Sequence, residues 1–210
     1  MEILELKPLR NKKVKLYLIR SEDKDFTNED YRNLREILEN ELFRFAVIDL
    51  NRKNLKEIYE EPLFRFLEKF KIPYYSVDIP ENVKDYLYVE ILEKEVQIND
   101  LEKEYSLLCV DPENQNSFKA QNLKSWIELL KKEVENKKKY LKLTVKPQWI
   151  VKQVLDIANR INNNEFSIMH FTYGELYSEL KKLFKEYNIK VIKIDIEKKN
   201  IKNILIENRR

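Results

Sequence analysis

Residues 166–196 read FSIMHFTYGELYSELKKLFKEYNIKVIKIDI, and this stretch decides the fold. FSIMHF (166–171) and KVIKIDI (190–196) are short runs rich in apolar, β-branched and aromatic residues, which favours strands. Between them an apolar stripe recurs at helical spacing, formed by Leu176, Leu180, Leu183, Phe184 and Tyr187. Thr172 and Glu175 predict a capping box, and Asn188 stands where a C-cap glycine is expected. The stretch therefore predicts a strand, a helix and a second strand.

The N-terminal part of the chain shows the same alternation. Strands are predicted at 14–19 (VKLYLI), 45–50 (FAVIDL) and 74–79 (YYSVDI). The first intervening helix begins at the N-cap Thr27 and has an apolar face of Tyr31, Leu34, Leu38 and Leu42. The second begins near Asn54, and Pro62 predicts a break or kink within it. Strands that alternate with helices predict a parallel sheet with right-handed crossovers.

The middle of the chain is predicted to be mainly helical. One helix has an apolar face of Ala120, Leu123, Trp126, Ile127, Leu130 and Val134, and another follows Trp149, with Pro147 in its first turn. The polar stretch DPENQNS (111–117) is predicted to be a loop. We expect an α/β half at 1–90, a helical insertion at 91–161 and a second half at 162–210 that completes the same domain.

Composition excludes several classes of protein. Gly174 is the single glycine, so neither a dinucleotide fingerprint, nor a P-loop, nor the serine elbow of α/β-hydrolases can be formed. The 40 basic and 37 acidic residues nearly balance, which is not typical of a dedicated nucleic-acid binder. The abundance of Lys, Glu and Ile is typical of a thermophilic or AT-rich source.

The chain shows no sign of export. It contains no apolar run of about 18 residues, and its N-terminus, MEILELKPLR, lacks the apolar core of a signal peptide. Cys109 is the single cysteine, which excludes an internal disulfide and fits a reducing compartment. We therefore expect a soluble cytoplasmic protein.

Ligands of parallel sheets collect at the carboxyl ends of the strands, so polar residues there are the candidates for a site. Asp49 and Asp78 could hold a divalent cation or act in acid–base catalysis, and His170, the one histidine, could act as a general base. Alternatively, the carboxylates bind backbone amides and the imidazole is a satisfied core group. Further ligand-binding candidates near these strand ends are Glu22, Thr172, Tyr173 and Gly174.

A basic cluster in the helical middle is the candidate nucleic-acid surface. It comprises Lys131 and Lys132 and the run Lys137, Lys138 and Lys139, with aromatic residues nearby for stacking. Glutamates lie among these lysines, so a solvated helix face is the alternative interpretation.

Two segments carry a family resemblance. Residues 47–53 (VIDLNRK) look like a V-E-L-D-x-R-R strand, with Asp49 at the glutamate position, and residues 77–79 (VDI) look like a later aspartate strand. In these segments and in the order of its elements the chain resembles the TraB/PrgY-like superfamily, which includes ChaN-like and Tiki relatives. The family's two Gly-x-x-His motifs are replaced by 20–23 (RSED) and 170–173 (HFTY). The resemblance therefore implies a fold whose metal-dependent hydrolysis has been lost.

These observations lead to one main hypothesis and two alternatives. We expect a non-enzymatic α/β binding or scaffold module that binds a protein partner, needs no cofactor and could form a homo-oligomer. The first alternative is a metal-dependent hydrolase or nuclease that uses the strand-end carboxylates. The second is a nucleic-acid-binding protein that uses the lysine cluster.

Overall fold

A five-stranded parallel sheet forms the framework of the chain, whose computed structural model describes residues 6–9, 11–21, 34–36, 41–49 and 62–195. The strands are β1 (Lys13–Ser21), β2 (Phe43–Ile48), β3 (Tyr74–Ser76), β4 (Glu165–Tyr173) and β5 (Lys190–Asp195). They are arranged in the order β3-β2-β4-β1-β5, and every neighbouring pair is parallel. The predicted α/β class is therefore confirmed.

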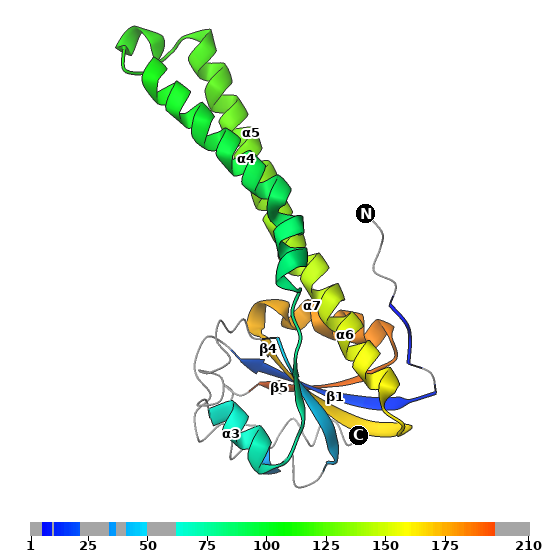
Figure 1. Cartoon of the computed structure of the whole chain (residues 1–210). Helices are drawn as coiled ribbons and strands as arrows, with labels where there is room; N and C mark the ends of the chain where they lie inside the picture. The colour runs from blue at the N-terminus through cyan, green and yellow to red at the C-terminus, as the bar shows by residue number, and fades with distance from the viewer. Residues whose placement is uncertain (1–5, 10, 22–33, 37–40, 50–61, 196–210) are drawn as a thin grey trace. The chain divides into compact units, whose positions relative to one another are not determined.

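Each face of the sheet has its own apolar core, because side chains alternate along every strand. Tyr17 and Ile19 of β1 pack in one core with Leu34 and with α3 (Pro62–Lys69). Leu16 and Leu18 pack in the other core. That core is covered by α6 (Lys146–Arg160) and α7 (Gly174–Glu186), which Figure 1 shows on the opposite side of the sheet from α3.

The connections make the carboxyl end of β4 a topological switch point. The chain after β1 and β2 returns through Leu34 and α3 on one face, whereas the chain after β4 returns through α7 on the other. This distribution is what right-handed crossovers require for strands added in opposite directions. β4 lies between β2 and β1. The chain that leaves each of these two neighbours crosses one face of the sheet, whereas the chain that leaves β4 crosses the other face.

Several local predictions are wrong. Leu42 was predicted on a helix face, but it precedes β2 outside any helix and is 86% exposed. β3 ends at Ser76, so Asp78 follows the strand instead of lying within it. β4 continues to Tyr173, so Thr172 is a strand residue and not the cap of α7, which begins at Gly174. The predicted helix start at Thr27, and residues 54–61, lie outside the described residues.

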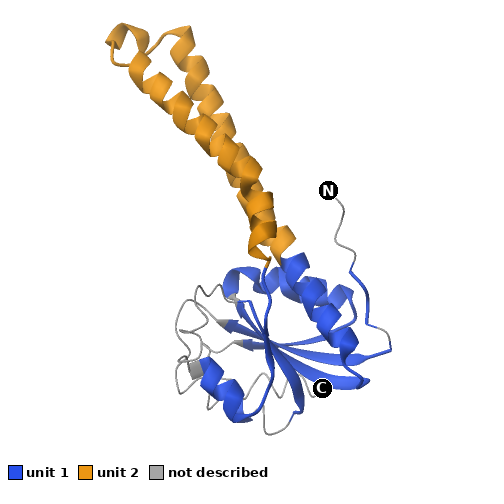
Figure 2. Ribbon diagram, viewed as in Figure 1, with its two compact units in different colours: residues 1–78, 147–210 blue, residues 79–146 orange. Residues whose placement is uncertain are grey.

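The chain divides into two compact units, which Figure 2 shows in different colours. The sheet unit comprises residues 1–78 and 147–210, and the second unit comprises residues 79–146. These boundaries differ from the predicted 90/91 and 161/162, because α6 packs on the sheet. Pro147 is the second residue of α6, as expected, and a π-helical turn at Leu141–Val145 precedes it.

The second unit is a helical hairpin of α4 (Glu81–Leu108) and α5 (Phe118–Tyr140). Ser117 caps α5 by accepting a hydrogen bond from the amide of Ala120. Buried and half-buried residues recur in both helices at alternating spacings of three and four, the pattern of a coiled coil. In α4 these positions are Leu87, Ile91, Lys94, Ile98, Leu101, Tyr105 and Leu108, and in α5 they are Ala120, Leu123, Ile127, Leu130, Val134 and Lys137.

Helix ends that usually need glycine are made here with other residues. Asn188 follows α7 with φ 59°, which confirms its predicted left-handed conformation. Lys71 follows α3 with φ 53°, and the amide of Ile72 bonds back to the carbonyl of Leu67 at 2.9 Å. Unlike asparagine, lysine has no short polar side chain that could hydrogen-bond locally and stabilise a left-handed backbone. Residue 71 is therefore a point of local strain.

We expect Lys71→Gly to raise the free energy of unfolding by about 0.5–1 kcal/mol. Glycine removes roughly 1–2 kcal/mol of left-handed strain and loses part of that gain through its greater entropy in the unfolded chain. Lys69→Gly is the matched control, because residue 69 is helical and glycine there lowers stability by up to about 1 kcal/mol. Urea unfolding measures both, and shifts of the same sign would contradict the assignment.

Candidate functional site

Asp49, His170 and Thr172 form a buried polar cluster at the carboxyl ends of β2 and β4. The Thr172 hydroxyl donates a hydrogen bond to Asp49 Oδ2 at 2.7 Å, and His170 Nε2 lies 3.3 Å from the same oxygen. Asp49 is 1% exposed, and the other two residues are fully buried. The structure therefore brings together two of the three predicted catalytic residues and one predicted ligand-binding residue.

The position of this cluster follows from strand alternation. Val47 and Ile168 point into the core under α6 and α7, so Asp49 and His170, each two residues further on, point to the same side. The His170 ring packs edge to face against Phe184 of α7, with the ring centroids 5.7 Å apart. The amide of Asp49 also bonds to the carbonyl of Phe171 at 3.2 Å, which holds the end of β2 against β4. The cluster thus lies at the switch point of the sheet.

Gly174 provides space for the side chain of Arg20. A Cβ atom at residue 174 would lie 2.8 Å from Arg20 Nε and 3.1 Å from Nη2. Arg20 is on β1 opposite Thr172 of β4, so its guanidinium reaches the first residue of α7. The φ of Gly174 is not positive, so close approach of the Arg20 side chain is the feature of this position that a Cβ atom would disturb.

Two atoms of the cluster are buried without a hydrogen-bond partner among the described residues. They are Asp49 Oδ1 and His170 Nδ1. A carboxylate that accepts from a hydroxyl and faces an imidazole is also the arrangement that orients a general base. The geometry is therefore compatible with a structural role and with proton transfer, and the complete burial favours the structural one.

The other predicted site residues do not join this cluster. Asp78 is half-buried, its carbonyl accepts a hydrogen bond from Gln153, and it is not among the hydrogen-bond partners of Asp49. Glu22 and the side chain of Tyr173 lie outside the described part of the chain. Within the described part, no three His, Cys, Asp or Glu residues are grouped as a metal site would require.

A second polar cluster, centred on Glu41, was not predicted. The Glu41 carboxylate accepts hydrogen bonds from Lys15 Nζ at 3.0 Å and Ser167 Oγ at 2.9 Å, and also from the Tyr17 hydroxyl. Burial alone would raise the pKa of Glu41, but these hydrogen bonds and the charge of Lys15 lower it below its ordinary value. Burial raises the pKa of Tyr17 far above its ordinary 10.0, and Glu41 raises it further.

The raised pKa of Tyr17 predicts a loss of stability in alkali. The folded state keeps the phenol protonated, so this contribution is complete below pH 10.0 and is lost as pH rises from there toward the folded-state pKa. We expect the free energy of unfolding to fall by up to about 1.4 kcal/mol per pH unit above that point because of this group. Urea unfolding at pH 8 and pH 11 should show a smaller fall in Tyr17→Phe than in the unmodified chain. An identical fall would contradict the prediction.

The lysines predicted to bind nucleic acid mostly pair with glutamates across the hairpin. Lys131, Lys137 and Lys138 each lie 2.6 Å from an acidic oxygen, of Glu102, Glu90 and Glu95 respectively. The hydrogen bond from Lys137 lowers the pKa of Glu90. Lys139 is exposed, and its side chain forms no ion pair with another described residue. Three lysines of the cluster are thus engaged in ion pairs between α5 and α4.

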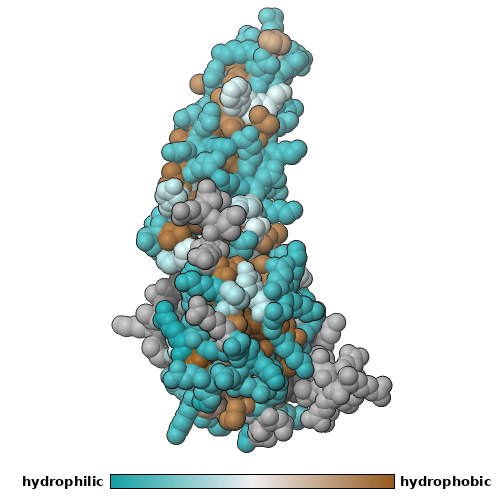
Figure 3. Space-filling model, turned by 90° about the vertical axis from the view of Figure 1, so that its right-hand side faces the viewer, coloured by the Kyte–Doolittle hydropathy of each residue, from teal (hydrophilic) through white to brown (hydrophobic). Residues whose placement is uncertain are grey.

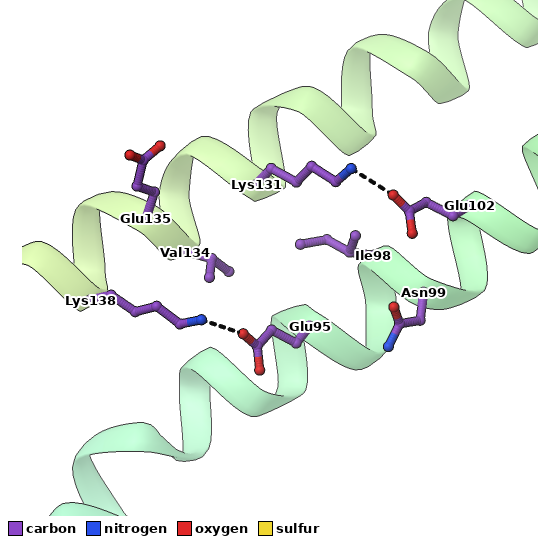
Figure 4. Close-up of a pocket in the computed structure, with 8 residues that line it drawn as sticks. All are labelled: Glu95, Ile98, Asn99, Glu102, Lys131, Val134, Glu135 and Lys138. Atoms are coloured by element: carbon purple, nitrogen blue, oxygen red, sulfur yellow. Dashed lines mark hydrogen bonds and ion pairs between the residues drawn. The ribbon is translucent and has the colours of Figure 1, made fainter.

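An open groove of about 540 Å³ runs between the two helices on one side of the hairpin (Figure 4). The ion pairs of Lys131 with Glu102 and Lys138 with Glu95 span it, and Ile98 and Val134 lie between them. Asn99 and Glu135 complete the lining. Four of the five charged side chains that line it are thus already paired.

Most of the large apolar side chains that are exposed in the described part of the chain lie on the hairpin. Of thirteen large apolar side chains that are exposed among the described residues, eleven lie in residues 79–146. Trp126, predicted to be part of the apolar helix face, is instead 55% exposed, because Ile127 takes the inward position beside it. Figure 3 shows apolar residues at the surface of α4 and α5 among hydrophilic ones. The heptad spacing of the inward-facing residues of α5 was the sequence signal that would have placed Trp126 outside the contact between the two helices.

Comparisons with known proteins leave the family open. The chain matches no protein-family model, no curated protein and no solved structure. The resemblance to the TraB/PrgY-like superfamily therefore stays a prediction. Among the described helices, none combines the length and apolarity that a membrane crossing needs.

Proposed function

We propose that the protein is a non-enzymatic binding module and that its helical hairpin, residues 79–146, is the surface that contacts a protein partner. The single observation that carries this proposal is the concentration of exposed apolar side chains on the hairpin. Exposed apolar side chains that gather on one part of a protein mark candidate interaction sites, whereas singly scattered ones need no explanation. Exposed Trp and Tyr side chains strengthen the argument, because these residues supply much of the binding energy of interfaces.

The hairpin is built to keep such a surface in place. Most of its inward positions hold apolar residues, and cross-helix pairs such as Glu104 with Lys119 and Glu133 with Lys94 fix the register. Exposed pairs of this kind contribute little stability individually, but they specify which residues face each other. The outward residues are therefore presented by a paired, register-fixed scaffold.

The state of the sheet site supports a non-enzymatic role. Asp49 Oδ2 is occupied by Thr172 and His170, and all three residues are buried. The second predicted carboxylate, Asp78, is not among the partners of Asp49. An acid–base pair in a hydrolase needs access to substrate, and this cluster is instead arranged as the polar part of a core.

Site-specific photo-cross-linking tests the proposal. A benzophenone residue is introduced at Trp126 or at Leu129, and the variants are produced in the organism of origin. We expect discrete cross-linked products at both positions. The matched control is Lys124, which is also exposed on α5 but lies on nearly the opposite side of the helix from Trp126. Equal yields at Trp126 and Lys124, or none at any hairpin position, would contradict the proposal.

A hydrolase is the second candidate, and one observation favours it. Asp49 and His170 meet at the switch point of the sheet, where ligands of parallel sheets bind, and each has one buried atom without a partner among the described residues. Hydrolysis that requires a divalent cation and disappears in Asp49→Ala would establish this function.

Nucleic-acid binding stays a prediction. A steep loss of nucleic-acid binding with added salt would support it.

A further inference from the structure

We propose that the hairpin binds a second copy of this chain, so that two hairpins form a four-helix bundle. This inference rests on the proposed function and identifies the partner. It uses one side of the hairpin, which we name the Trp126 face. The face is made of Tyr86 and Leu107 from α4 and of Trp126, Leu129 and Tyr140 from α5.

Heptad geometry places these residues on one side. Trp126 and Tyr140 are spaced by seven from Lys119 and Glu133, which pair with Glu104 and Lys94 of α4. These two ion pairs therefore mark the side of the hairpin to which Trp126 belongs. The groove of Figure 4 is lined by the other row, Glu95, Glu102, Lys131 and Lys138, on nearly the opposite side of each helix.

The two helices carry opposite charge, which selects the arrangement of the copies. α4 has eight acidic side chains and three lysines, whereas α5 has seven lysines and three glutamates. We place the two copies about a two-fold axis that runs parallel to the helices, with their Trp126 faces in contact. This arrangement puts α4 of each copy against α5 of the other. All neighbouring helices are then antiparallel and opposite in charge, as in a stable four-helix bundle.

The levels of the residues along the hairpin agree with this arrangement. Glu90 pairs with Lys137 and Lys94 with Glu133, so position 93 stands level with position 134. Glu93 of one copy then lies beside Lys132 of the second copy. Neither residue forms an ion pair within the described part of a single chain. Tyr86 of one copy similarly lies level with Tyr140 of the second, which favours aromatic contact.

A charge swap tests the proposed contact. We expect the full chain to sediment at twice its 25.7 kDa mass at micromolar concentration. Glu93→Lys and Lys132→Glu should each weaken the dimer by about tenfold, because each creates two like-charge contacts across the two-fold axis. The double variant carrying both changes should restore the dimer. Restoration cannot arise from a general effect on folding.

Two apolar substitutions locate the interface. Trp126→Glu should weaken the dimer by about 30-fold or more, as expected for a central aromatic residue. Leu92→Glu is the matched control, because Leu92 is also 55% exposed but lies outside the Trp126 face, and it should leave the dimer unchanged. Circular dichroism of all variants should show the unmodified helix content.

Three results would overturn this inference. The first is that the chain is monomeric at all concentrations. The second is that Trp126→Glu leaves the dimer intact. The third is that the double charge variant dimerises no more tightly than either single variant. Each is separable from failure of the proposed function. A monomer that still gives discrete cross-links from Trp126 to a different protein would preserve the binding role and remove the second copy as the partner.

Discussion

Asp49→Ala is expected to lower the free energy of unfolding by about 2–6 kcal/mol, because each of two buried polar groups that loses its partner costs about 1–3 kcal/mol. The Asp49 carboxylate is the shared partner of His170 and Thr172, so its removal leaves a buried imidazole and a buried hydroxyl without their bonds. Asp49→Asn retains an oxygen to which the Thr172 hydroxyl can donate a hydrogen bond. It should therefore lower the free energy of unfolding by less than Asp49→Ala does. Urea unfolding at pH 7 measures all variants.

Asp156→Ala is the control for loss of an ordinary aspartate. Asp156 is partly exposed and pairs with Lys152 one turn earlier on α6, so its replacement should change stability by less than about 0.5 kcal/mol. If Asp49→Ala were more stable than the unmodified chain, the structural role would be contradicted. A carboxylate whose removal stabilises the fold is typical of a functional site, and such a result would favour the hydrolase.

Phe184→Ala is expected to lower the free energy of unfolding by about 3–5 kcal/mol as well. The ring is fully buried, closes the core between α7 and the sheet, and packs against His170 with an interplanar angle of 83°. Its loss therefore leaves a cavity beside the polar cluster. The same urea titration measures the change, and comparison with Asp49→Ala shows whether the core and the cluster stabilise the fold to a similar extent.

Phe118→Ala is the matched control for this substitution. Phe118 begins α5 and is 80% exposed, so removing its ring should change stability by less than about 0.5 kcal/mol. Should Phe118→Ala destabilise the chain as much as Phe184→Ala, Phe118 would have to be buried in solution. That outcome would contradict the assignment of residue 118 to the exposed surface of the hairpin.

The sheet was predictable because each of its strands is a local signal. Apolar runs such as VKLYLI and FSIMHF are buried on both faces of a parallel sheet, and they were placed to within a few residues. The order of the strands was not predictable, because it depends on pairings between segments as distant as β1 and β4. The ends of strands were also difficult to predict: Thr172 was predicted to cap the following helix, but β4 continues through it to Tyr173.

The candidate site was partly predictable. Strand-end position singled out Asp49, His170 and Thr172, but only the register of β2 with β4 shows that they contact one another. The Glu41 cluster had no signal in the sequence, since Lys15, Tyr17 and Ser167 are brought together only by pairing of distant strands. Trp126 was misplaced because a broad apolar stripe was expected where the helix uses a narrow coiled-coil seam.

Hydrogen exchange measured by mass spectrometry tests most directly whether the hairpin is the binding surface. The full chain is compared at concentrations above and below that at which it associates. We predict slower exchange at high concentration in peptides that cover 81–108 and 118–140, and no change in peptides from 43–49 and 165–173. Protection confined to 165–173 at the carboxyl end of β4, with the hairpin unchanged, would contradict the account and assign binding to the sheet.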